Sequence, residues 1–174
     1  EEGVIVKAHV KSEGGNSVKL ASTLAIGCAG VFVEKPIDEV FNTWVGNNHV
    51  FIIDKSGSMG WGGDKMNRAK NALLKALNEM LPYKKFYVYF FSNGAVKMEP
   101  DESLLAFQYN VDLVSPWIKK QRAGGGTNPS EALKDAFTTK QPEVIWLLTD
   151  GYFNRSKNIR GLITQVNTDR NVRV

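Results

Sequence analysis

The sequence has few of the residues on which nucleophilic and redox chemistry depends. Its 174 residues include one cysteine and two histidines. The single cysteine, Cys28, excludes an internal disulfide. Neither His9 nor His49 stands in a triad arrangement with a serine, and no GxSxG motif surrounds Ser56 or Ser58. The sequence therefore does not predict an enzyme.

Long runs of one kind of residue are also missing. The net charge is +4, but lysine and arginine nowhere reach the density of a nucleic-acid-binding segment, so an acidic partner is favoured over a nucleic acid. The main apolar run, residues 20–33, is shorter than the roughly twenty residues that span a membrane, which favours a buried strand or packed segment. Small apolar residues before Cys28 would also fit a lipoprotein cleavage site, but the long charged segment ahead of them is unlike a signal sequence.

What the sequence does contain is centred on residues 50–59, VFIIDKSGSM. The apolar residues predict a buried strand, and Asp54, Ser56 and Ser58 follow at alternate positions, so all three side chains can point the same way. One carboxylate and two hydroxyls suit a hard cation such as Mg²⁺ or Mn²⁺, which prefers oxygen to nitrogen or sulfur. A loop that caps a helix is the structural alternative.

Two later segments add oxygen ligands in similar places. Thr127 follows three glycines in GGGTNP, and Asp150 ends the apolar run of VIWLLTDG, where a buried strand would reach its loop. This ordered set of motifs resembles the von Willebrand factor A domain family and its metal-ion-dependent adhesion site. The resemblance covers residues 48–174, and it is closest to bacterial members, which share the first motif, a tryptophan before the glycine loop (Trp117) and LLTDG.

The resemblance implies a metal-dependent protein-binding module for adhesion or assembly, not an enzyme. Ser56, Ser58 and Thr127 would lie next to a Mg²⁺ ion, or Mn²⁺ or Ca²⁺ in its place, while Asp54 and Asp150 would supply charge and orient water. One open coordination position would take a Glu or Asp carboxylate of a protein partner. The compartment is left open by the sequence, with an extracytoplasmic or membrane-associated place favoured.

Strands that alternate with amphipathic helices predict a doubly wound, mostly parallel α/β sheet with one antiparallel edge strand after Asn93 and Gly94. We expect residues 48–174 to form this domain without its last strand and helix. Residues 1–47 are expected to form an extension with a hairpin, an apolar segment and a linker helix, which could also serve in assembly.

Aromatic and polar residues next to the three motifs predict a partner-binding rim. Trp61 lies after the first motif, Asn128 follows the second, and Tyr152, Phe153 and Arg155 follow the third. Such residues often dominate interface energetics, although the Trp61 ring could instead fold back over the sheet. Asn128 is also placed to cap the next helix.

Three alternatives remain open from the residues. The glycine-rich loop could cradle phosphate or a nucleotide, but neither GxxxxGK[ST] nor GxGxxG is present. Asp54 could act as a phosphoryl acceptor in a hydrolytic domain, but Ser56 occupies the place of the next acid. The domain could also be structural, with an unused site.

Overall fold

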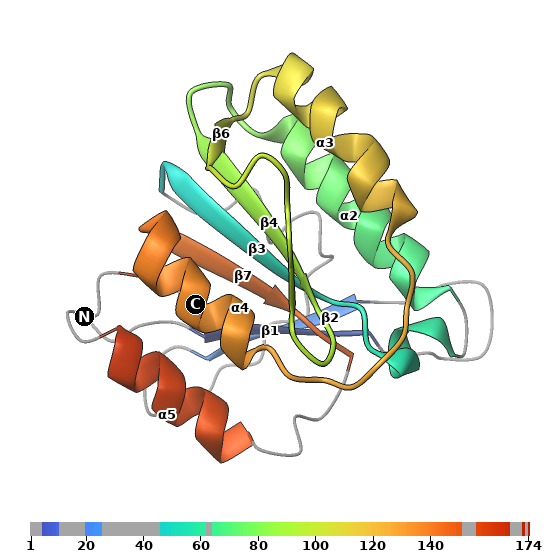
Figure 1. Cartoon of the computed structure of the whole chain (residues 1–174), viewed down its shortest axis with the longest axis vertical. Helices are drawn as coiled ribbons and strands as arrows, with labels where there is room; N and C mark the ends of the chain where they lie inside the picture. The colour runs from blue at the N-terminus through green and yellow to red at the C-terminus, as the bar shows by residue number, and fades with distance from the viewer. Residues whose placement is uncertain are drawn as a thin grey trace.

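The computed structural model describes residues 5–10, 20–25, 46–61, 64–150, 156–167, 172 and 174. These residues form a mixed sheet with helices on both of its faces, the doubly wound α/β architecture that the sequence predicted (Figure 1). The strand order is β2-β1-β7-β3-β4-β5, and β6 pairs with β4 beside β5.

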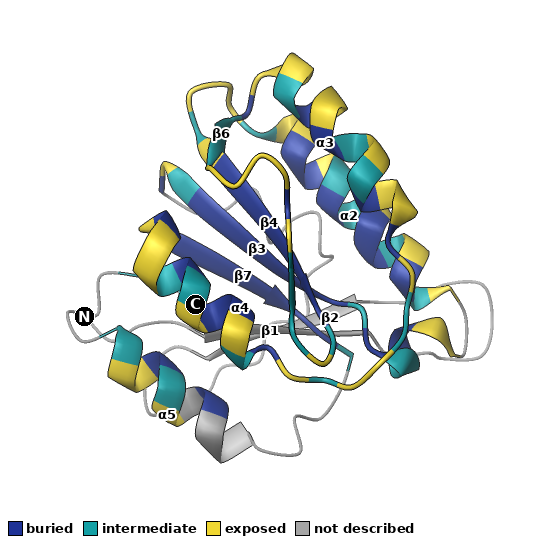
Figure 2. Cartoon of the chain, in the orientation of Figure 1, coloured by how far each residue is buried: buried dark blue, intermediate teal, exposed yellow. Residues whose placement is uncertain are grey.

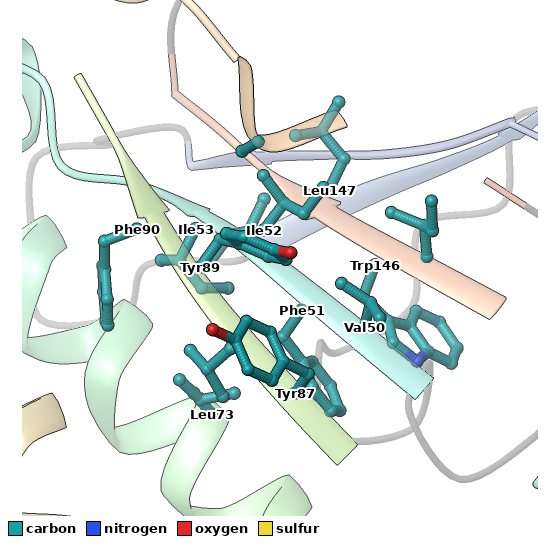
Figure 3. Packing of buried hydrophobic residues seen from close by; sticks show 14 of the residues in the cluster. Val50, Phe51, Ile52, Ile53, Leu73, Tyr87, Tyr89, Phe90, Trp146 and Leu147 are labelled. Carbon is teal, nitrogen blue, oxygen red and sulfur yellow. The ribbon is translucent and has the colours of Figure 1, made fainter. Parts of the chain in front are cut away.

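Three parallel strands form the centre of the sheet: β3 (Asn48–Asp54), β4 (Lys85–Phe91) and β7 (Val144–Leu148). Almost every residue of these strands is buried, because helices cover both faces (Figure 2). Side chains from the three strands pack against one another and against Leu73 from a covering helix (Figure 3). This core fixes the carboxyl ends of β3 and β7 side by side.

Helices α2 (Lys65–Glu79) and α3 (Gln108–Lys120) lie together on one face of the sheet. Helix α4 (Ser130–Asp135), continued by a π-helical turn (Ala136–Lys140), lies with α5 (Ser156–Val166) on the other face. The buried face of α2 is apolar apart from Lys70, whose ammonium donates to the carbonyl oxygens of Lys119 and Gln121 at the end of α3. Lys70 therefore caps a neighbouring helix, a role that the pattern of α2 alone does not reveal.

The edge of the sheet beyond β4 is antiparallel, as predicted. Asn93 and Gly94 turn the chain into β5 (Ala95–Lys97), which pairs antiparallel with β4. Strand β6 (Leu104–Leu105) also pairs antiparallel with the beginning of β4 and was not predicted. Two residues are too few to show an alternation in sequence.

The opposite edge is formed by the predicted N-terminal hairpin. Strands β1 (Ile5–Val10) and β2 (Leu20–Ala25) pair antiparallel, and β1 continues the main sheet by running parallel to β7, with Ala8 opposite Leu148. The hairpin thus shares a sheet with the rest of the chain. The predicted linker helix lies outside the described residues, and the domain boundary at residue 47 stays a prediction.

His49 has a structural role at the amino end of the sheet. Its Nδ1 accepts a hydrogen bond of 3.1 Å from Trp146 Nε1, and its Nε2 donates to the Gly46 carbonyl oxygen at 2.9 Å. Burial lowers the pKa of His49, so the ring stays neutral and keeps both bonds. The imidazole lies at the other end of β3 from Asp54.

Candidate functional site

Asp54, the last residue of β3, is completely buried at the carboxyl end of the sheet. Its Oδ1 accepts a hydrogen bond from the Ser56 backbone N–H at 2.7 Å, and its Oδ2 accepts one from the Thr149 hydroxyl at 2.5 Å. Burial raises the pKa of Asp54, and these hydrogen bonds oppose that rise. The two donors fix the orientation of the carboxylate.

The predicted serines connect this strand end to Asp150. Ser56 Oγ and Ser58 Oγ lie 2.9 Å apart, and Ser58 Oγ donates to Asp150 Oδ1 at 2.8 Å. We call Asp54, Ser56, Ser58 and Asp150 the oxygen cluster. It combines the ends of two neighbouring strands, β3 and β7, and includes four of the five residues predicted to bind metal.

The glycine-rich loop, residues 124–128, is attached directly to the first site loop. Gly57 N–H donates to the Gly125 carbonyl oxygen at 2.9 Å, and Gly124 N–H donates to the Lys55 carbonyl oxygen at 2.7 Å. Thr127, which is half-buried, follows two residues after Gly125 in this attached loop. Within the described part of the chain, no hydrogen bond joins the Thr127 hydroxyl to the cluster.

The same loop is attached on its other side to the turn between β4 and β5. Gly126 N–H donates to Asn93 Oδ1, and Asn128 N–H donates to the Ser92 carbonyl oxygen, both at 2.7 Å. The Asn128 side chain accepts from Ser130 N–H at 3.2 Å, but the N-cap of α4 is Pro129, so Asn128 lies one residue before the capping position that the sequence predicted for it. Glu131 does not complete a capping box with Asn128, because its carboxylate accepts from Ala95 N–H in β5.

We expect Gly125→Ala to lower the free energy of unfolding by about 1–2 kcal/mol, the cost of a left-handed backbone at a residue with a Cβ. Gly125 has φ +83°, and an added Cβ would lie 3.1 Å from Ser92 Oγ. Gly124→Ala is the matched control, because its added Cβ would meet no atom within 4 Å. Urea unfolding of both variants measures the difference, and equal losses would contradict a special role for Gly125.

The predicted rim is described only in part. The Trp61 side chain is exposed, with 77% of the residue accessible, so it does not fold back over the sheet. Asn128 is also exposed. Tyr152, Phe153 and Arg155 lie outside the described residues.

Two residues at the site were missed by sequence reasoning. Thr149 holds Asp54, and Lys65 Nζ lies 2.5 Å from Asp150 Oδ2. Thr149 could have been noticed as a polar residue at the end of a buried strand. Lys65 is a cation at the beginning of a helix, where the helix dipole disfavours positive charge, and that mismatch was the available signal.

The chemistry of these side chains fits a hard divalent cation. The described residues contain no group of three or more His, Cys, Asp or Glu side chains that could hold a metal. A cation at this place would therefore rely on serine and threonine hydroxyls together with the two carboxylates of the oxygen cluster. Such a set of oxygen donors suits Mg²⁺, Mn²⁺ or Ca²⁺.

Comparison of the sequence with curated proteins finds two informative relatives. Von Willebrand factor A domain-containing protein 3B of Homo sapiens is 30% identical over 106 residues, which are 60% of this chain and 8% of that protein. Inter-alpha-trypsin inhibitor heavy chain 4 of Mus musculus is 30% identical over 154 residues, 81% of this chain and 15% of that protein. The chain thus spans only a small part of either relative. No model of a protein family matches it.

Solved structures share the fold. A von Willebrand factor type A protein from Catenulispora acidiphila superposes with a TM-score of 0.63 at 22% identity, covering 95% of this chain and 38% of that one. Proximal thread matrix protein 1 from the mussel byssus, solved with zinc in its metal-ion-dependent adhesion site, gives a TM-score of 0.53 at 22% identity over 72% of this chain and 33% of that one. The similar proteins come from mammals and a mussel as well as from Catenulispora, so they do not single out bacterial members. The chain has the fold of von Willebrand factor A domains, and over 60% of its length its sequence is similar to a protein that contains such a domain.

Proposed function

We propose that residues 48–174 bind one divalent cation through the oxygen cluster and Thr127, and that the bound cation accepts a carboxylate from a protein partner. The observation that carries the proposal is the continuous contact of Ser56, Ser58 and Asp150 at the ends of β3 and β7. Ligands bind beyond the carboxyl ends of the strands in open α/β sheets. The domain would then act in adhesion or assembly.

The balance of charge explains why the partner would be acidic. Only two members of the oxygen cluster carry negative charge, and the other members are neutral hydroxyls. A cation held largely by neutral oxygens stays attractive to a further anion. A Glu or Asp side chain is the commonest such anion on a protein surface, and exposed Trp61 would contact the residues around it.

A bacterial-type origin, an extracytoplasmic or membrane-associated location and a role of residues 1–47 in assembly belong to the same proposal. No helix in the described parts of the chain is long and apolar enough to cross a membrane.

The alternative functions have less support. Phosphate binding would need free N–H groups in the glycine-rich loop, but those of Gly124, Gly126 and Asn128 already donate to protein oxygens. Hydrolysis by Ser56 would need a base, and His49 is buried at the opposite end of β3. A structural domain with an unused site would bind neither a cation nor an acidic partner.

Titration calorimetry with MgCl₂, MnCl₂ and CaCl₂ tests the first half of the proposal, and we expect one site per chain. Immobilised peptides that differ only in Glu against Gln test the second half. Binding should require the cation, disappear in EDTA and disappear with the Gln peptide. Absence of cation binding at millimolar concentration, or peptide binding that is equal in EDTA, would overturn the proposal.

A further inference from the structure

Lys65 places a positive charge inside the candidate site. It is the first residue of α2, and its Nζ lies 2.5 Å from Asp150 Oδ2 and 3.4 Å from the Ser58 carbonyl oxygen. The Lys65 side chain is 17% exposed and that of Asp150 is completely buried. The contact is therefore a largely desolvated ion pair, unlike the solvated pairs of the protein surface.

The position of Lys65 is unfavourable apart from this contact. The beginning of a helix carries partial positive charge, and the first turn of α2 contains no acidic residue; Asp64, the N-cap, accepts a hydrogen bond from the Asn67 side chain. Asp150 is likewise costly to bury without a cationic partner. Each charge of the pair compensates for the other.

Lys65 and a divalent cation would use the same carboxylate. Asp150 Oδ1 accepts from Ser58 and Oδ2 accepts from Lys65, so the ammonium occupies the oxygen that the serine leaves available. A divalent cation close to this carboxylate would be repelled by the Lys65 ammonium. It would also be attracted less strongly to Asp150, because the ammonium already balances the charge of that carboxylate. Removal of the lysine charge removes both effects.

We propose that Lys65 is a built-in competitor of the divalent cation: its ammonium holds Asp150 in the metal-free protein and must be displaced, or its contact weakened, when the cation binds. The inference rests on the proposed function and adds a residue that regulates the affinity of the site for the cation. Lys65 stabilises the metal-free site and lowers its affinity for the cation. The cation concentration at which the site becomes competent for an acidic partner is therefore set by a residue outside the predicted ligands.

Lys65→Gln tests the inference by titration calorimetry with MgCl₂ and MnCl₂. We expect the variant to bind the cation roughly 5- to 150-fold more tightly, the usual range of coupling between two binding events. Lys55→Gln is the matched control, because it removes the same charge from the site loop while its ammonium donates to Gln121 Oε1 at 3.2 Å and not to a carboxylate. The control should bind with wild-type affinity.

Thermal unfolding supplies an independent measurement. In EDTA, Lys65→Gln should melt below the wild type, because buried Asp150 loses its partner; saturating MgCl₂ should raise its melting temperature more than that of the wild type. Lys65→Met serves in the same two experiments if the glutamine variant does not fold.

The outcomes separate the two proposals. If the wild type binds the cation and both Lys65 variants bind it with equal or weaker affinity, the competitor role is overturned. The proposed function then stands. An equal gain in Lys55→Gln would also overturn it, because the effect would then be one of general charge. Absence of cation binding in the wild type would overturn the proposed function itself, and with it the competitor role of Lys65 that rests on it.

Discussion

Asp150→Asn is expected to weaken Mg²⁺ and Mn²⁺ binding by more than about 100-fold, since changes even outside the direct ligands of a metal typically cost 10–100-fold. The asparagine keeps the size of the side chain and its Oδ1 can still accept from Ser58, but one of two negative charges is lost. Titration calorimetry measures the loss. The far-ultraviolet circular dichroism should remain that of the wild type.

Asp112→Asn is the control for this experiment, because it removes an exposed carboxylate from α3. Asp54→Ala is less informative than Asp150→Asn. It would remove the buried acceptor of the Ser56 N–H, at a cost of about 1–3 kcal/mol, and the hydrogen bond from the Thr149 hydroxyl. Unchanged affinity in Asp150→Asn would remove this residue from the site.

Much of the site was predictable because its residues are marked by local sequence. Asp54 and Asp150 each end a run of apolar residues, and such runs become central parallel strands when helices cover both faces. Neighbouring parallel strands end at the same edge, which brings the two motifs together although 96 positions separate them in the chain. Whether Thr127 binds a cation with them remains a prediction.

The parts that were missed depend on which elements meet in space. Lys65 and Lys70 both lie on α2, and each ammonium reaches a different neighbour, Asp150 or the end of α3. Glu131 has the spacing of a capping box but binds the edge strand β5, because that N–H lies within reach after folding. A helical pattern shows on which face of the helix a side chain lies, but it does not show which residue that side chain contacts.

The N-terminal segment shows the same limit. Alternation predicted the hairpin of β1 and β2, and the structure confirms that pairing. That β1 also lies beside β7 could not be read from the segment, since strand alternation does not specify the neighbouring strand.

A second network, away from the oxygen cluster, is formed by the tyrosines of β4. The Tyr89 ring is completely buried, and its hydroxyl donates to Asp135 Oδ2 at 2.6 Å. Lys97 Nζ reaches the same oxygen at 2.8 Å from β5. Burial, together with the Asp135 carboxylate, raises the pKa of Tyr89, so the hydroxyl keeps its proton and remains a donor. Asp135 thus connects the central sheet, the edge strand and the end of α4.

Asp135→Ala is expected to lower the free energy of unfolding by about 1–3 kcal/mol, because it removes the carboxylate that accepts the hydrogen bond of the buried Tyr89 hydroxyl. The Lys97 contact adds little, since that side chain is 39% exposed and solvent screens its charge. Lys75→Ala is the control: the exposed Lys75 and Glu79 pair spans 3.9 Å along α2, and its loss should cost at most about 0.5 kcal/mol.

Tyr89→Phe shows whether the hydroxyl without its carboxylate acceptor causes the loss. Added to Asp135→Ala, it removes the buried hydroxyl that has lost its carboxylate acceptor, so the double variant should be no less stable than Asp135→Ala alone. Urea unfolding of the four proteins completes a double-mutant cycle, in which a coupling of about 1 kcal/mol or more is expected for residues in direct contact. Additive losses would place the effect of Asp135 elsewhere, in its contact with Lys97 or in the helix itself, because a hydrogen bond between the two residues cannot be lost twice.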